Sequence, residues 1–312
     1  MTAQFPDEQS RTGEFQRQDD AFRRWVLAEP NAEFPAQAGR YHLYVSLACP
    51  WAHRTIIVRK LKGLESAIGM TIVDPIRDDR GWRFFEPDPI NGWNYLSQAY
   101  SATDPSYDGR VTVPVLWDTV SKRVVSNSDD DIMRMFEHEF DAFGDAGLEL
   151  YPQSLHGQID ELNELLYMTV NNGVYRAGFA TSQRAYERAA YKVFETLDAM
   201  DKRLADRRYL FGDQPLESDW RFFVTLIRFD AVYFGHFKCN LRRIVDYPNL
   251  AGYVRDLYQI DRVASTVDFD HIKRHYYATH EQINPTRIVP IGPLQDFAAP
   301  HARERLVGGR AS

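Results

Sequence analysis

A short stretch between Tyr44 and Arg54 does most to constrain the fold of this chain. It reads Tyr-Val-Ser-Leu-Ala-Cys-Pro-Trp-Ala-His-Arg, so a run that favours a strand ends at Cys49 and is followed at once by Pro50. Proline is favoured at the first position of a helix, and the order strand, cysteine, helix is therefore predicted. A sulfur at that junction faces unpaired backbone N–H groups and the positive end of the helix dipole, which favour the nucleophilic thiolate.

The same cysteine has a plainer interpretation. Free cysteines are often buried and inert, so Cys49 could pack as a small apolar side chain. Ala52 stands where a Cys-x-x-Cys motif would have its second thiol, which excludes a dithiol cycle within the motif and leaves an outside thiol for redox chemistry. Cys239 lacks a strand-to-helix context and is expected to be structural. Two cysteines are too few for a disulfide framework and are consistent with a reducing compartment.

Composition narrows the classes of protein to consider. The chain has 312 residues, 44% of them hydrophobic, which is enough for two domains of modest size. A formal net charge of −7 and the lack of a recurring basic stripe argue against a nucleic-acid partner. The polar N-terminus does not resemble a secretory signal, and no run of 18 apolar residues indicates a membrane span. We therefore expect a cytoplasmic protein.

The first half of the chain alternates strands and helices. An N-terminal arm, 1–38, precedes an expected domain at 39–145. Within that domain the pattern predicts strands at 42–47, 68–73, 111–118 and 124–126, and helices at 50–62 and from Asn127 to Phe136. The segment 74–110 has no convincing element and is expected to be a functional loop or a lid. Pro114 interrupts a strand pattern, which is disfavoured unless it marks an edge or a special turn.

From about residue 155 the apolar residues repeat with helical spacing. This spacing predicts helices at 155–173, 182–205, 217–234, 248–260 and 267–279, within a helical domain at 155–290 and before a tail at 291–312. The predicted fold is an α/β N-terminal domain joined to an all-α C-terminal domain.

Several of these segments together resemble one family. They are Cys49-Pro50-Trp51-Ala52, the Val113-Pro114 turn, the helix start at 127–135, and the run from His271 to Thr286. In combination they resemble the glutathionyl-hydroquinone reductases, the Xi class of the glutathione transferase superfamily, and the likeness extends from about Phe15 to Pro293.

The resemblance implies an α/β thioredoxin-like N-terminal domain, an all-α glutathione-transferase-like C-terminal domain and a thiol-dependent reductive dethiolation. Cys49 would attack the sulfur of an S-conjugated hydroquinone, expel the hydroquinone and keep the small thiol as a mixed disulfide, which a second thiol would release. The family also suggests a homodimer. In thioredoxin-like domains the turn corresponding to Val113-Pro114 contains a cis proline that faces the active cysteine.

The resemblance also implies roles for particular residues. Trp82 would pack on the bound thiol, and Val113, just before Pro114, would pair its backbone with the cysteinyl part of that thiol. Tyr175 and Tyr276 would line the quinol pocket and donate to a phenolic oxygen, with Tyr277 as the substitute for Tyr276 if the register differs by one; each tyrosine could instead be ordinary packing.

One segment departs from the family pattern. Where the family has Glu-Ser holding the γ-glutamyl group, this chain has Ser128-Asp129, followed by Asp130 and Asp131. Three carboxylates would oppose the carboxylate of glutathione at that helix start. The co-substrate is therefore expected to be glutathione or a mycothiol-type thiol without that free carboxylate, unless these acids are simply caps on a solvated turn.

Other kinds of site find little support. His271 and His275 have a spacing that can bind zinc, but no third ligand accompanies them, and no metal is expected. Asp219 is expected to be a folding cap rather than a catalyst. Two alternatives to the quinol reductase stay open: a general glutaredoxin-like dethiolating reductase that uses Cys49, and a non-catalytic binding protein in which Cys49 is buried.

Overall fold

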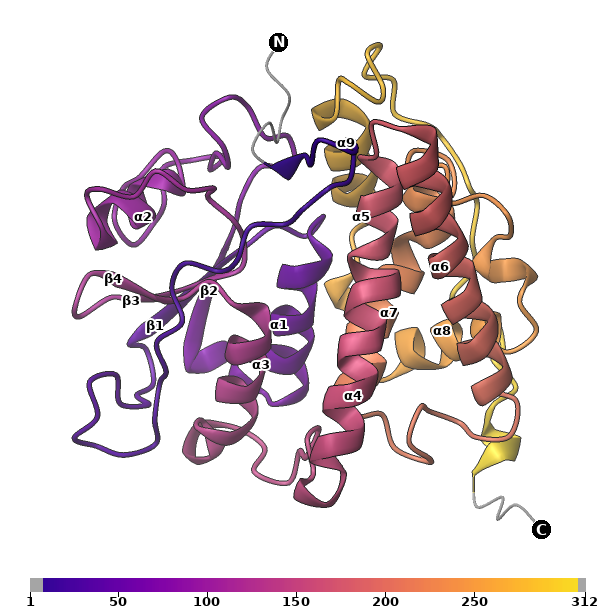
Figure 1. Ribbon diagram of the computed structural model, residues 1–312. Coiled ribbons are helices and arrows are strands. Elements are labelled where there is room, and N and C mark those ends of the chain that lie inside the picture. The colour runs from indigo at the N-terminus through magenta and orange to yellow at the C-terminus, as the bar shows by residue number, and fades with distance from the viewer. Residues whose placement is uncertain (1–7, 308–312) are drawn as a thin grey trace. The chain divides into compact units, whose positions relative to one another are not determined.

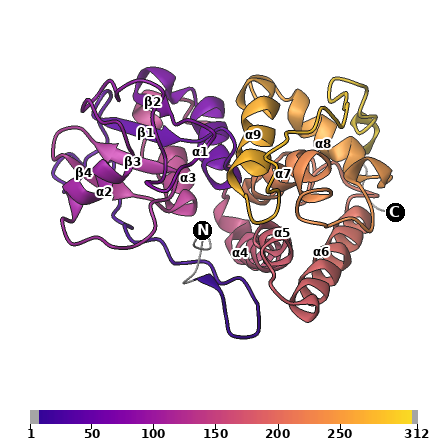
Figure 2. The same cartoon turned by 90° about the horizontal axis from the view of Figure 1, so that it is seen from above.

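The computed structural model describes residues 8–307, and this part of the chain divides into two compact units (Figures 1 and 2). The sheet unit comprises 18–149 and 265–279, and the helical unit comprises the described parts of 1–17, 150–264 and 280–312. The predicted combination of a thioredoxin-like domain and an all-helical domain is confirmed. Residues 1–7 of the expected arm and 308–312 of the expected tail lie outside the described residues.

A sheet of four strands organises the sheet unit, in the order β2-β1-β3-β4. The strands are β1 (Tyr41–Val45), β2 (Ile68–Ile72), β3 (Val115–Asp118) and β4 (Arg123–Ser126). β1 pairs in parallel with β2, through the crossover helix α1 (Pro50–Leu61), and antiparallel with β3, which pairs antiparallel with β4. α3 (Asp129–His138) packs against α1 on one side of the sheet, and α2 (Ser97–Thr103) lies on the other (Figure 1).

Two predictions for this unit were wrong in detail. The third strand begins at Val115 rather than at Val111, because the cis peptide bond at Val113-Pro114 turns the chain just before it and proline has no N–H for the ladder. The segment 74–110 contains helix α2, which has no side-chain cap; its buried Tyr100 donates its hydroxyl to the Thr112 carbonyl at 3.0 Å. A tertiary contact of this kind has no local sequence signal.

The unit boundaries also differ from the expected ones. Residues 18–38 belong to the sheet unit because the arm extends the sheet edge: Arg24 N–H donates to the Val125 carbonyl at 3.0 Å, and Asn127 N–H donates to the Phe22 carbonyl at 3.0 Å. Helix α9 (Phe269–Thr279), expected in the helical domain, also belongs to the sheet unit.

The helical unit is built around α7 (Glu217–Arg228), in which every residue is buried. The other helices are α4 (His156–Leu166), α5 (Gly173–Gly178), α6 (Gln183–Arg203) and α8 (Leu250–Gln259). The predicted helix at 155–173 is in fact α4 followed by a π-helical turn at Tyr167–Asn171, and α7 likewise runs into a π-helical turn at Phe229–Tyr233. Among the described residues, no helix has both the length and the apolar character that crossing a membrane requires.

Asp219 lies in the first turn of α7, where its side chain makes the hydrogen bonds of a helix cap. Its buried carboxylate accepts hydrogen bonds from the N–H groups of Leu210 and Leu216, at 2.9 and 2.8 Å, and from the Tyr253 hydroxyl at 2.7 Å. Burial raises the pKa of Asp219 to about 6. The expected role as a folding cap is confirmed, since this carboxylate ties the helix start to a preceding loop and to α8.

Candidate active site

Cys49 lies where the sequence predicts, between β1 and α1. It is the N-cap residue of α1, with Pro50 in the first turn, and its side chain is partly exposed. The Cys49 sulfur makes no capping hydrogen bond and lies 3.5 Å from the Val113 carbonyl oxygen, to which a thiol can donate. Two effects therefore compete at this sulfur: the helix N-terminus favours the thiolate, and the Val113 carbonyl favours the thiol.

The cis peptide bond at Val113-Pro114 confirms the predicted special turn. Both residues are buried, and the turn brings the Val113 carbonyl to Cys49 although 64 residues separate them in the sequence. The chain thus places a strand-end cysteine and a cis-proline turn side by side, an arrangement that leaves backbone groups next to the sulfur. Such backbone groups can pair with an extended ligand as an added strand does.

Cys239 has the structural character that the sequence predicts. Its side chain is fully buried in the helical unit, and burial raises the pKa of the Cys239 thiol to about 12. The two cysteines of the chain therefore lie in opposite environments, one at a helix start with access to solvent and one in apolar packing.

Trp82 lies on an ordered part of the long loop. Short bridges between Val73 and Phe84 and between Arg83 and Tyr95 hold this part of the loop, and the Trp82 carbonyl accepts a hydrogen bond from Leu96 N–H at 2.9 Å. The indole is 5% exposed and stacks on the ring of His275, with ring centroids 5.1 Å apart. This part of the predicted lid is therefore fixed by backbone pairing and aromatic stacking.

His275 contacts the long loop in a way that its spacing from His271 did not predict. Its Nδ1 lies 2.7 Å from the Pro75 carbonyl oxygen, which can only accept, so Nδ1 carries a proton and donates it to this oxygen. The ring also contacts Tyr276 edge-on, with centroids 5.2 Å apart. With the hydrogen bond between His53 and Thr266, at 2.7 Å, these contacts explain why α9 belongs to the sheet unit. The residues described contain no group of three His, Cys, Asp or Glu side chains that could hold a metal.

The three candidate tyrosines differ in their surroundings. Tyr276 is 1% exposed and Tyr277 is half-buried, both on α9. Tyr175 is on α5 in the helical unit, where its ring contacts Phe179, Tyr233 and Phe237. The Arg17 guanidinium lies 4.9 Å from the centroid of that ring. Because Tyr175 and Tyr276 belong to different units, their joint role in a pocket stays a prediction.

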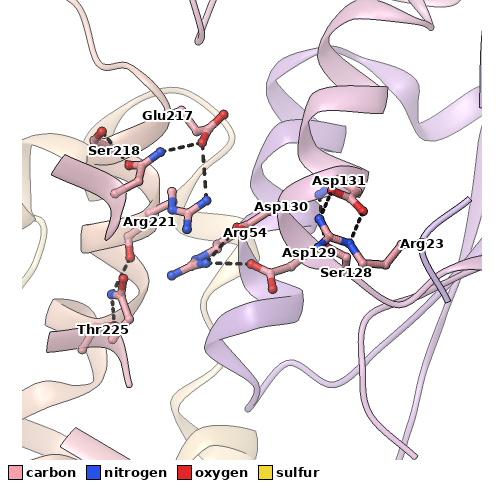
Figure 3. A network of polar contacts seen from close by, with 12 residues as sticks. Arg23, Arg54, Ser128, Asp129, Asp130, Asp131, Glu217, Ser218, Arg221 and Thr225 are labelled. Atoms are coloured by element: carbon pink, nitrogen blue, oxygen red, sulfur yellow. Dashed lines mark hydrogen bonds and ion pairs between the residues drawn. The ribbon is translucent and has the colours of Figure 1, made fainter. Parts of the chain in front are cut away.

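The start of α3 is an organised charge cluster (Figure 3). Ser128 is the N-cap residue, and its hydroxyl accepts from Asp131 N–H at 3.3 Å. Arg54, 1% exposed, donates to Asp129 at 2.7 Å, and Arg23 pairs with Asp131 through two hydrogen bonds of 2.8 and 2.7 Å.

This pairing corrects the expectation of three opposing carboxylates. Two arginines offset two of the three aspartates, which leaves a formal charge of about −1 rather than −3. Asp130 lies 3.4 Å from Arg54, and its side chain is 42% exposed. No local pattern could reveal the Arg54–Asp129 pair, since 75 residues separate its members.

Comparisons with known proteins agree with this geometry. Models of the glutathione S-transferase N-terminal and C-terminal domains match residues 48–139 and 183–256. Glutathionyl-hydroquinone reductase YqjG of Escherichia coli is 50% identical over 97% of this chain and 96% of its own length, and glutathionyl-hydroquinone reductase PcpF of Sphingobium chlorophenolicum is 48% identical over 93% of both chains.

Two solved structures have the same fold. The glutathione-bound structure of E. coli YqjG has a TM-score of 0.87 at 51% identity, covering 91% of this chain and 96% of that one. The Xi glutathione S-transferase of Phanerochaete chrysosporium has a TM-score of 0.88 at 49% identity, covering 92% and 99%. The chain therefore belongs to the Xi class of the glutathione S-transferase superfamily, the family that includes the glutathionyl-hydroquinone reductases.

Proposed function

We propose that this protein is a thiol-dependent reductase that removes a small thiol from S-conjugated hydroquinones, with Cys49 as the nucleophile. The observation that carries the proposal is the partly exposed Cys49 at the start of α1, beside the cis Val113-Pro114 turn. About half of the residues are identical to those of YqjG and PcpF, both named as glutathionyl-hydroquinone reductases, over nearly the whole chain.

The proposed reaction has two balanced steps. The Cys49 thiolate attacks the sulfur of the conjugate, an S–S bond forms, and the bond between sulfur and the ring carbon breaks. The electron pair of that broken bond stays on the ring as an enolate, which takes up a proton and becomes the hydroquinone. A second small thiol then attacks the mixed disulfide, releases Cys49 and leaves as the oxidised disulfide.

The other proposed residues act around this sulfur. Val113 would pair its backbone with the cysteinyl part of the bound thiol, next to Pro114, and Trp82 would pack on that thiol. Tyr175 and Tyr276 would donate to the developing phenolic oxygen, with Tyr277 as the substitute for Tyr276.

Turnover of a glutathionyl-hydroquinone, followed by chromatography of the released hydroquinone, tests the proposal. The wild-type protein and the control Cys239→Ser should release hydroquinone at similar rates, because Cys239 is buried away from solvent. Cys49→Ser should release none. Mass spectrometry of the wild-type protein without added thiol should show one thiol bound at Cys49, and release of hydroquinone by Cys49→Ser would refute the mechanism.

We further propose glutathione as the co-substrate. The structure of YqjG contains bound glutathione, and the arginine pairing at Asp129 and Asp131 leaves only about one net negative charge against its γ-glutamyl carboxylate at Ser128 and Asp129. A mycothiol-type thiol is the competing candidate, supported by the exposed Asp130, to which sugar hydroxyls could donate.

The thiol dependence of turnover separates these candidates. Asp130→Asn should lower the KM for glutathione two- to fivefold, since one exposed charge near another carboxylate costs about 1 kcal/mol in water. Asp108→Asn, an exposed substitution on the long loop, is the control and should leave this KM unchanged. Faster turnover with mycothiol than with glutathione in the wild-type protein would overturn the assignment.

The family resemblance also supports a homodimer and a cytoplasmic location, which we propose together with this activity. Light scattering coupled to size-exclusion chromatography should give twice the mass of the 36.2 kDa chain. A monomer at micromolar concentration would contradict the first proposal, and recovery of the protein from a periplasmic or membrane fraction would contradict the second.

A further inference from the structure

The N-terminal arm lies beside α5 in the helical unit (Figure 1). Two hydrogen bonds fasten residues 8–17 to the chain just after α5: the Thr181 N–H donates to the Gly13 carbonyl at 3.0 Å, and the Ser182 hydroxyl donates to the Thr12 carbonyl at 2.8 Å. Gly13 has a φ of +81°, and a Cβ atom there would lie 2.8 Å from the Thr181 hydroxyl oxygen. Only glycine therefore allows the arm to approach this closely.

The arm places Arg17 against the ring of Tyr175. The guanidinium carbon lies 4.9 Å from the centroid of the Tyr175 ring and 5.6 Å from that of Phe15. Arg17 Nε also donates to the side-chain oxygen of Asn172 at 3.1 Å. Asn172 directly precedes α5 and lies three residues before Tyr175. The hydrogen bond and the ring contact therefore join Arg17 to one turn of the chain.

Aromatic rings hold other parts of Tyr175, whose side chain is 9% exposed. The Tyr175 ring has its centroid 6.1 Å from that of Phe179, 6.0 Å from that of Tyr233 and 5.4 Å from that of Phe237. The orientation of the ring, and with it the direction of the hydroxyl, is set by these rings together with the guanidinium.

We propose that Arg17 is a positioning residue, which holds Tyr175 in the orientation that donates to the phenolic oxygen of the substrate. This inference rests on the proposed reductase activity, in which Tyr175 is a proton donor. The negative face of an aromatic ring attracts a cation, and the bond to Asn172 keeps the guanidinium in place. A donor that is held in the correct geometry does not have to be ordered again in each transition state.

Two substitutions of similar length test the contribution of the cation. Arg17→Met keeps an unbranched side chain without a charge, and it should lower kcat for release of hydroquinone from a glutathionyl-hydroquinone about two- to fivefold, with little change in KM. Arg17→Lys should keep more than about half of the wild-type kcat, because an ammonium group is also attracted to the ring. Arg11→Met, at an exposed position on the same arm, is the control and should leave both constants unchanged.

The background Tyr175→Phe separates positioning of the hydroxyl from a general effect of the arm. This variant keeps the ring and removes the hydroxyl. Adding Arg17→Met to it should therefore change the remaining turnover by less than about 1.5-fold, because no donor is left to position.

Unfolding in urea measures the contact without reference to turnover. Arg17→Met should raise the equilibrium constant of unfolding about two- to fivefold more in proteins that have a ring at position 175, the wild type and Tyr175→Phe, than in Tyr175→Leu. Arg17 should thus act on the ring in stability and on the hydroxyl in turnover, a difference that a purely structural arm does not produce.

Any of three results would overturn the role of Arg17: a wild-type kcat in Arg17→Met, an equal loss of kcat in Arg17→Lys, or the same fold loss with and without the Tyr175 hydroxyl. If the wild-type protein releases no hydroquinone, the proposed reductase activity fails, and the role of Arg17 in turnover fails with it. If the wild-type protein and Tyr175→Phe behave as proposed while Arg17→Met is normal, only the inference about Arg17 fails.

Discussion

Iodoacetamide should alkylate Cys49 about 5,000-fold faster than Cys239 in the folded protein at neutral pH. The reagent reacts with thiolates, so the rates report how strongly each site populates its anion. Single-thiol proteins, Cys239→Ser for Cys49 and Cys49→Ser for Cys239, isolate the two reactions.

The magnitude follows from the two environments. Burial raises the pKa of Cys239 from an ordinary 9.0 to about 12, which lowers its thiolate population about a thousandfold. At Cys49 the start of α1 stabilises an anion by about 1 to 2 kcal/mol, and the weak contact with the Val113 carbonyl opposes this by about 0.5 kcal/mol. A net gain of about 1 kcal/mol is roughly a fivefold rise in thiolate, and the product of the two factors is about 5,000.

The assay measures alkylated peptide by mass spectrometry over time, with the same proteins unfolded in guanidinium chloride as the reference. Folding should speed alkylation of Cys49 about fivefold and slow that of Cys239 by about a thousandfold. If Cys49 reacts no faster in the folded protein than in the unfolded one, the helix start does not activate its sulfur, and the non-catalytic interpretation of this cysteine gains support.

Three further predictions follow from the structure. Tyr175→Phe and Tyr276→Phe should each slow quinol turnover about 100-fold, because each removes a hydroxyl donor to the phenolic oxygen. Reduction of a simple disulfide by glutathione should change less than about threefold in the same variants. Equal losses in both reactions would favour a general dethiolating reductase. Arg303→Ala should lower the free energy of unfolding in urea by about 2–4 kcal/mol. The reason is that the buried guanidinium donates to the carbonyls of Leu204, Arg207, Arg208 and Asn249. Arg305→Ala, at an exposed position, is the control, and equal stabilities of the two variants would contradict this role. Burial lowers the pKa of His42 from 6.5 to about 4, so between these pH values the unfolded chain binds a proton that the folded chain does not. Up to about 3 kcal/mol of the free energy of unfolding should therefore be lost as the pH falls from 6.5 to 4. Urea titrations of His42→Gln across this range should show a shallower decline of that free energy with pH, and an unchanged decline would refute the assignment.

The predictions that the structure confirms depend on residues that are adjacent in the sequence. The start of α1 follows from Pro50 after an apolar run, and the start of α3 follows from Ser128 before three acids. Helical periodicity located α6 to within two residues at each end, because its buried face repeats along a single segment. The predictions were wrong where the local pattern was ambiguous, at the strand before Val115 and at the uncapped helix α2.

The sequence by itself determined the cysteine at a helix start, the turn at Pro114 and the alternation of strands and helices, because each depends on the conformational preferences of adjacent residues. The tertiary structure alone decided that Arg54 pairs with Asp129 and that His275 stacks on Trp82. Those contacts join residues far apart in the chain, and their energies depend on burial and distance, which local spacing does not encode.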